Sequence, residues 1–131
     1  MRIVLAGATG VIGIRMLPLL LAAGHQVLAL TRREEKLAAL RELGADPLRC
    51  DVYDADALQA AVVAYRPDLV VHQLTDLADD MALIDSAANG RMRTEGTANL
   101  LAAAVAAGVP GMLAQSIAWD GGPAVTEHER V

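Results

Sequence analysis

The sequence predicts an α/β fold in which helices cover both faces of a doubly wound parallel sheet. Two observations support this prediction. Apolar runs of strand length alternate with helix-length segments along the chain, and a glycine-rich turn separates the first run from the first helix. A helix-length connection between successive strands requires parallel pairing and right-handed crossovers. The expected sheet has about five strands in the order 3-2-1-4-5.

Five short runs have the length and composition of buried strands. They are Ile3–Ala6, Gln26–Leu30, Pro47–Arg49, Asp68–His72 and Gly111–Gln115. The segments between them carry apolar residues at helical spacing and are expected to form helices. These helices are Val11–Ala23, Glu34–Leu43, Ala55–Ala64 and a long region from about Met81 to Ala107 with a break near Asn89-Gly90.

Residues that favour helix ends or kinks lie where these assignments need them. Gly24, Gly44 and Gly108 follow three of the helices, a common position for a capping glycine. Asp54 precedes the third helix and is a good N-cap. Pro18 lies inside the first helix and should kink it, because proline removes one backbone hydrogen bond.

The run Val4–Gly13 is the most informative motif, because it places three glycines at G-x-x-G-x-x-G spacing between a strand and a helix. Gly7 can adopt the backbone angles of a sharp turn, Gly10 leaves room for a pyrophosphate, and Gly13 lets the helix pack close to the strand. The N–H groups at the helix N-terminus then face the phosphates. The motif predicts a Rossmann-type dinucleotide site contacted by Gly7, Thr9, Gly10, Val11 and Ile12. The alternative is a glycine turn that binds nothing.

Length and composition limit the class of protein. The 131 residues fit one domain, and its core must be built from Leu, Val, Ile and Ala because Phe is absent. A net charge of −5 argues against nucleic acid and against anionic membrane surfaces. No stretch has the length of a membrane span or of a signal-peptide core. The single cysteine, Cys50, has no partner for a disulfide or a metal site. We therefore expect a cytoplasmic protein without bound metal.

The end of the second strand selects the dinucleotide. An acidic side chain there accepts hydrogen bonds from the adenosine ribose and favours NAD. This chain instead has Thr31-Arg32-Arg33, and the first acid is Glu34. Two guanidinium groups and a hydroxyl suit a 2′-phosphate, which predicts that NADP(H) is preferred over NAD(H). The alternative is that both arginines are solvated charges at the start of a surface helix, with Glu34 and Glu35 as partners.

Two further strand ends carry candidate site residues. Asp51 follows the third strand and can accept a hydrogen bond from the adenine amino group while Val52 packs on the ring, or it can cap the next helix. After the fourth strand, Gln73-Leu74-Thr75 should face the middle of the cofactor. His72, at the end of that strand, is expected to be a satisfied buried histidine rather than a catalyst.

The motifs occur in the order and spacing of a known superfamily. They are the glycine motif, Asp51-Val52, Pro67–His72, Gly96-Thr97-Ala98-Asn99-Leu100-Leu101 and Ala114-Gln115-Ser116. Together they resemble the extended short-chain dehydrogenases/reductases, in particular the NAD(P)-dependent epimerase/dehydratase family, over nearly the whole chain. The resemblance implies that the cofactor, NADP or NAD, is lined by Gly7, Gly10, Ile12, Arg32, Asp51, Val52, Leu74 and Thr75. It also implies a catalytic role for Ser116, which would hydrogen-bond the reacting carbonyl or hydroxyl.

The sequence departs from that family at the catalytic pair. The family uses a tyrosine as general acid/base and a lysine four residues later, both beyond the serine. The tyrosines of this chain, Tyr53 and Tyr65, and its one lysine, Lys36, all precede Ser116. The Tyr-x-x-x-Lys pair is therefore absent. In addition, Arg93 stands where the family often has an asparagine.

Three functional hypotheses follow. In the first, residues 1–131 form a single dinucleotide-binding domain. This domain is the cofactor half of an NADP-dependent reductase, epimerase or dehydratase whose C-terminal substrate part is missing. We expect this chain alone to have little catalytic activity toward a small-molecule substrate. In the second, the chain is a non-catalytic NADP(H)-binding redox sensor or regulatory module. In the third, it is an interaction domain with a vestigial glycine loop.

A chain ending at Val131 leaves the fifth strand as an open sheet edge, which predicts a homo-oligomer.

Overall fold

The computed structural model describes residues 1–75 and 86–116, and it confirms the predicted sheet. Five parallel strands pair in the order β3-β2-β1-β4-β5. They are β1 (Arg2–Ala6), β2 (Gln26–Thr31), β3 (Asp46–Arg49), β4 (Leu69–His72) and β5 (Met112–Ala114). Each strand differs from its expected range by no more than one residue at either end, because short apolar runs define buried strands well.

Helices connect the strands, with two corrections to the expected ranges. They are α1 (Gly13–Ala22), the 3₁₀ turn η1 (Glu34–Lys36), α2 (Leu37–Glu42), α3 (Ala55–Tyr65), α4 (Ser86–Arg91), the π-helical turn η3 (Met92–Gly96) and α5 (Thr97–Ala106). The first helix begins two residues later than expected, since Val11 and Ile12 belong to the glycine turn. The expected helix Glu34–Leu43 is divided between η1 and α2. Within the described ranges, no helix combines the length and the hydropathy that a membrane span requires.

The break expected near Asn89-Gly90 is wrong. Both residues lie within α4, and the irregularity comes later, as the π-helical turn η3 between α4 and α5. Glycine is tolerated inside a helix at a modest cost, so its presence alone does not end one. The expected helix start near Met81 lies outside the described residues.

The helix ends agree with the sequence. Gly24, Gly44 and Gly108 all have positive φ directly after their helices. The Asp54 carboxylate accepts a hydrogen bond from the backbone N–H of Ala57 at 3.1 Å and so caps α3. Pro18 lies within α1, and the kink expected there stays a prediction.

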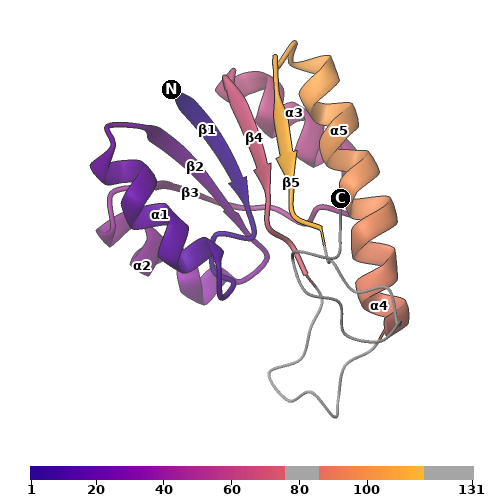
Figure 1. Ribbon diagram of the computed structural model, residues 1–131, viewed down its shortest axis with the longest axis horizontal. Coiled ribbons are helices and arrows are strands. Elements are labelled where there is room, and N and C mark those ends of the chain that lie inside the picture. Colours follow the sequence, from indigo (N-terminus) through magenta and orange to yellow (C-terminus); the bar gives the residue numbers. More distant parts are fainter. Residues whose placement is uncertain (76–85, 117–131) are drawn as a thin grey trace, which may run out of the picture.

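The sheet is buried on both faces, which produces three layers (Figure 1). Alternate residues of β1 belong to opposite halves of the core: Ile3 and Leu5 pack with Leu17 of α1 and Leu40 of α2. Val4 and Ala6 instead pack with side chains of the helices on the other face, namely Leu58 and Val62 of α3 and Leu100, Ala103 and Ala104 of α5. This is why the strands are almost continuously apolar rather than alternating.

Two glycines of the turn after β1 are required by close packing. Gly7 has φ +88°, and a Cβ added to it would lie 2.7 Å from the backbone carbonyl of Gln73, just beyond β4. A Cβ on Gly13 would overlap the carbonyl oxygen of Gly7 and lie 2.9 Å from the Cα of Ala8. The expected roles of Gly7 in the sharp turn and of Gly13 in close helix packing are therefore both confirmed.

We predict that Gly13→Ala lowers the free energy of unfolding by about 1–3 kcal/mol, because the added methyl group must displace rigid backbone. Denaturant unfolding followed by circular dichroism measures this change. Gly90→Ala is the matched control: Gly90 is helical, and a Cβ there meets nothing within 4 Å. The control should be neutral or slightly stabilising. Equal stability of Gly13→Ala and wild type would contradict the packing argument.

Candidate functional site

The candidate residues from the sequence converge on one edge of the sheet, where β1, β2, β3 and β4 end. The chain leaves β1 toward the face covered by α1 and reaches α5, on the opposite face, after β4 (Figure 1). The two strands are neighbours, and the N–H of Gln73 donates to the carbonyl of Ala6 at 2.9 Å just beyond their ends. Where the connections of two adjacent parallel strands lead to opposite faces of the sheet, a crevice opens between the strand ends. Open α/β sheets bind their ligands in this crevice.

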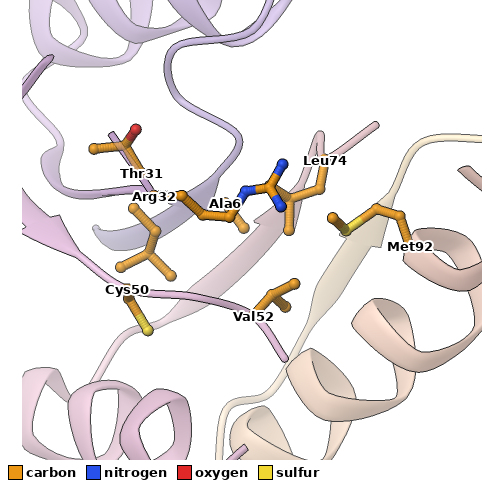
Figure 2. Close-up of a pocket in the computed structure, with 8 residues that line it drawn as sticks. Ala6, Thr31, Arg32, Cys50, Val52, Leu74 and Met92 are labelled. Atoms are coloured by element: carbon orange, nitrogen blue, oxygen red, sulfur yellow. The ribbon is translucent and has the colours of Figure 1, made fainter. Parts of the chain in front are cut away.

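A pocket lies in this crevice and encloses about 300 Å³, part of it open to solvent. The ends of four strands and the turn η3 all contribute to it (Figure 2). Its lining residues are Ala6, Leu30, Thr31, Arg32, Cys50, Val52, Leu74 and Met92. The guanidinium group of Arg32 extends over the pocket in Figure 2, in front of Ala6. We call this space the first pocket: it is mostly apolar with a cation at its mouth.

Hydroxyl groups tie the glycine loop to the end of β2. The Thr9 and Thr31 hydroxyls lie 3.4 Å apart, and Thr31 Oγ1 also accepts a hydrogen bond from the N–H of Arg33 at 3.2 Å. Arg33 itself does not line the first pocket. Glu34, the first acid after β2, forms an exposed ion pair with Arg49 of β3 at 3.5 Å. Its carboxylate is therefore engaged with β3, and it too is not among the lining residues.

The loop after β3 is held in place from two sides. The Asp51 carboxylate accepts a hydrogen bond from the N–H of Tyr53 at 3.0 Å, while Asp54 caps α3. The alternative in which Asp51 is the helix cap is therefore not what the structure shows. From the other side, the side-chain amide of Asn99 on α5 donates to the carbonyl of Val52 at 3.0 Å. This bond fixes Val52 against the first pocket.

The glycine loop itself leaves space that the protein does not use. A Cβ on Gly10 would meet only the carbonyl oxygen of Gly7, at 3.4 Å, so the fold does not strictly require glycine there. Val11 and Ile12 follow and are exposed, and Ile12, the N-cap of α1, makes no capping hydrogen bond through its side chain. The helix N-terminus thus presents backbone N–H groups and positive dipole charge to an anion.

A second pocket shares Leu74 with the first. Its other lining residues are His72, Arg93, Thr97, Ala114, Gln115 and Ser116. The structure therefore brings Ser116, at the end of β5, together with the end of β4 and the start of α5. Gln73 and Thr75 lie beside Leu74 in the segment after β4, and the side-chain oxygen of Gln73 is buried without a partner among the described residues.

His72 is buried and satisfied, as expected from the sequence. The ring is 4% exposed, and its Nδ1 accepts a hydrogen bond from the N–H of Leu74 at 3.1 Å. The proton must therefore sit on Nε2, which donates to the Thr97 hydroxyl at 2.9 Å. Burial lowers the pKa of His72 below its usual 6.5, and the nearby charge of Arg93 lowers it further. His72 is thus a neutral imidazole that links β4 to α5.

Four lining residues of the first pocket were not among the sequence candidates: Ala6, Leu30, Cys50 and Met92. Cys50 is half-buried, and burial, assisted by the charges of Asp54 and Asp51, raises the pKa of its thiol. It packs as a neutral apolar group. Met92 is fully buried, and Gly96 leaves room for its sulfur, since a Cβ there would lie 2.9 Å from Met92 Sδ. Ala6 and Leu30 end the first two expected strands and Cys50 follows the third, so their positions could have suggested pocket residues. No such signal pointed to Met92.

Sheet order, glycine turn and crevice together define a dinucleotide-binding protein of the Rossmann type. The family model for the NAD dependent epimerase/dehydratase family matches residues 3–124, so the chain belongs to that family. This confirms the resemblance inferred from the motifs.

Curated relatives agree with this assignment. A 3-diazoavenalumate denitrifying reductase from a Streptomyces species is 46% identical over 127 residues, which cover 94% of this chain and 40% of the relative. A probable NADP-dependent dehydrogenase from Dichelobacter nodosus is 44% identical over 64 residues, covering 47% of this chain and 60% of that protein. The chain thus spans less than half the length of the Streptomyces relative.

Among solved structures, the Bordetella bronchiseptica enzyme WbmG in complex with NAD is 29% identical and superposes with a TM-score of 0.70. The match covers 87% of this chain and 36% of that enzyme. The family to which the chain belongs is NAD dependent, so the cofactor is a nicotinamide dinucleotide, NAD or NADP. The open space at Gly10 and the N–H groups at the N-terminus of α1 suit its pyrophosphate.

The neutral state of His72 predicts a pH-dependent stability. Because its folded pKa lies below 6.5, the unfolded chain takes up a proton first as the pH falls, and the free energy of unfolding declines below about pH 6.5. The loss is at most about 1.4 kcal/mol per pH unit. Denaturant unfolding between pH 7.5 and 5.5 measures the slope.

His72→Gln should flatten this slope, whatever its effect on stability at pH 7.5. His25→Gln is the control, and it should keep the decline because His72 is still present. A wild-type slope that His72→Gln leaves unchanged would contradict the assignment.

Proposed function

We propose that this chain is the NADP(H)-binding half of a reductase of the epimerase/dehydratase family. The observation that carries the proposal is the position of Arg32: it lines the first pocket at the end of β2, and no acidic residue is found among the lining residues of that pocket. NAD-binding sites of this fold place an acid at the end of this strand for the adenosine ribose.

Four features support a preference for NADP. A guanidinium group is the side chain best suited to bind a phosphate through two parallel hydrogen bonds, so Arg32 suits the 2′-phosphate. Glu34, the first acid after β2, forms an ion pair with Arg49 and does not line the first pocket. The Dichelobacter relative is named as an NADP-dependent dehydrogenase, which accords with this preference. Arg33 lies close in sequence and would add to the local positive charge.

The reductase assignment rests on the Streptomyces relative, whose name is that of a reductase. When bound, NADPH would supply a hydride, and Ser116 in the second pocket would hydrogen-bond the reacting group.

We propose that this chain alone turns over little substrate, because no Tyr-x-x-x-Lys pair follows Ser116 in the 131 residues. The second candidate is a non-catalytic redox sensor, which a chain of 131 residues without this pair could form. Comparing the Kd values for NADP⁺ and NADPH discriminates the two, since a sensor must bind the two forms differently.

Arg32→Asp should lower the ratio of NADP⁺ to NAD⁺ affinity by at least about tenfold, because it removes a charge-assisted hydrogen bond to the phosphate and adds a repulsive charge. Calorimetric titration with each dinucleotide measures the ratio. Arg41→Asp makes the same charge change on α2, outside the lining residues of the first pocket, and should leave the ratio within about twofold.

An unchanged ratio in Arg32→Asp would refute the assigned preference. Failure of the wild-type chain to bind either dinucleotide would instead favour an interaction domain with a vestigial glycine loop.

We further propose that the chain self-associates through β5. In the described structure this strand pairs only with β4, and Leu113 on it is 60% exposed. Leu101 and Val105 on the adjacent α5 are exposed as well. Light scattering should give the mass of a dimer or larger species, and Leu113→Lys should shift it toward the monomer, because a charge on an edge strand opposes pairing. A monomeric wild type would contradict this.

A cytoplasmic location accords with the free thiol of Cys50.

A further inference from the structure

Arg93 is a cationic side chain that lines the second pocket. It is the second residue of the π-helical turn η3, whose first residue, Met92, lines the first pocket while Arg93 lines the second. The turn therefore directs two consecutive side chains into different pockets. Single π-helical turns within helices are frequent at functional sites, because the extra residue re-aims the side chains around it.

Among the residues that the structure describes, Arg93 has no ion-pair partner. It is half-buried, and the structure records neither an ion pair nor a hydrogen bond for it within residues 1–75 and 86–116. The two ion pairs recorded there involve Arg49 and Arg91. Its ionisable neighbour in the pocket, His72, is held neutral, partly by the charge of Arg93 itself. A half-buried guanidinium group that lines a pocket and has no ion pair in the described part of the chain is suited to bind an anion.

The polar groups beside Arg93 are suited to donate hydrogen bonds. Thr97 Oγ1 accepts a hydrogen bond from His72, which leaves its own hydroxyl hydrogen for a ligand. Ser116 and the amide of Gln115 line the same pocket. One guanidinium with neutral donors matches a singly charged carboxylate. A phosphate site would be expected to collect several cations or a helix N-terminus.

We propose that the second pocket binds the carboxylate group of a small-molecule substrate, with Arg93 as the residue that recognises it. This inference deepens the proposed function, since it rests on Ser116 and the second pocket being the substrate end of the site. The carboxylate then lies beside the Ser116 hydroxyl. Arg93 is a substrate-binding and specificity-determining residue, and substrates that lack the anionic group bind weakly.

The test compares a carboxylate with its neutral isostere. The 131-residue chain is titrated with benzoate and, separately, with benzamide at saturating NADP⁺, and chemical shifts in heteronuclear NMR give each Kd. Benzoate is expected to bind saturably and at least about tenfold more tightly than benzamide. Arg93→Gln should abolish that difference, and Arg93→Lys should keep part of it. Arg41→Gln, outside the lining residues of the second pocket, should leave it unchanged.

Equal affinity for the two probes in the wild type, or full retention of the difference in Arg93→Gln, overturns the inference. A tenfold loss of NADP⁺ affinity in Arg93→Gln also overturns it, since the anion would then be a cofactor phosphate. If Arg93→Gln does not fold, the wild-type comparison and Arg93→Lys decide. If NADP⁺ does not bind, the proposed function fails, and the same titrations without the dinucleotide still test Arg93.

Discussion

The close approach of the glycine turn to the end of β4 is the constraint on which the site depends. Gly7 packs against the backbone of Gln73, and Gly13 packs against Gly7, so β1, α1 and β4 meet with no side chain between them. This contact places the N-terminus of α1 beside the crevice between two strands whose connections leave in opposite directions. Any side chain at either glycine would push the helix, and with it the anion-binding N–H groups, away from the crevice.

Around this point, the fold builds two chemically different pockets. The first is apolar, with Arg32 at its mouth, and it combines residues from the ends of four strands. The second is polar, with Arg93, and it contains the serine at the end of β5. Leu74 lines both. Residues at or just beyond the ends of all five strands therefore contribute to the two pockets.

Neutral hydrogen bonds hold the second pocket in shape. His72 links β4 to α5 through Thr97, and Asn99, half a turn further along α5, fixes the carbonyl of Val52 after β3. One helix thus anchors the loops of both pockets. Because His72 is uncharged, this link does not compete with Arg93 for an anion. The cost is a site whose framework weakens when His72 becomes protonated.

The sequence by itself determined the order of strands and helices, the glycine turn and the arginine at the end of β2. These are local features: buried parallel strands are short apolar runs, and the residues after each strand necessarily lie at the same edge of the sheet. Only the tertiary structure decided that Met92 and Arg93 enter different pockets, that Cys50 lines the first, and that Asp54 rather than Asp51 caps α3. Met92 and Arg93 are the first two residues of a π-helical turn, and Gly96, the last residue of that turn, lies against Met92 and Val52. The approach of Gly96 to Val52 joins segments more than forty residues apart, which helical periodicity does not encode.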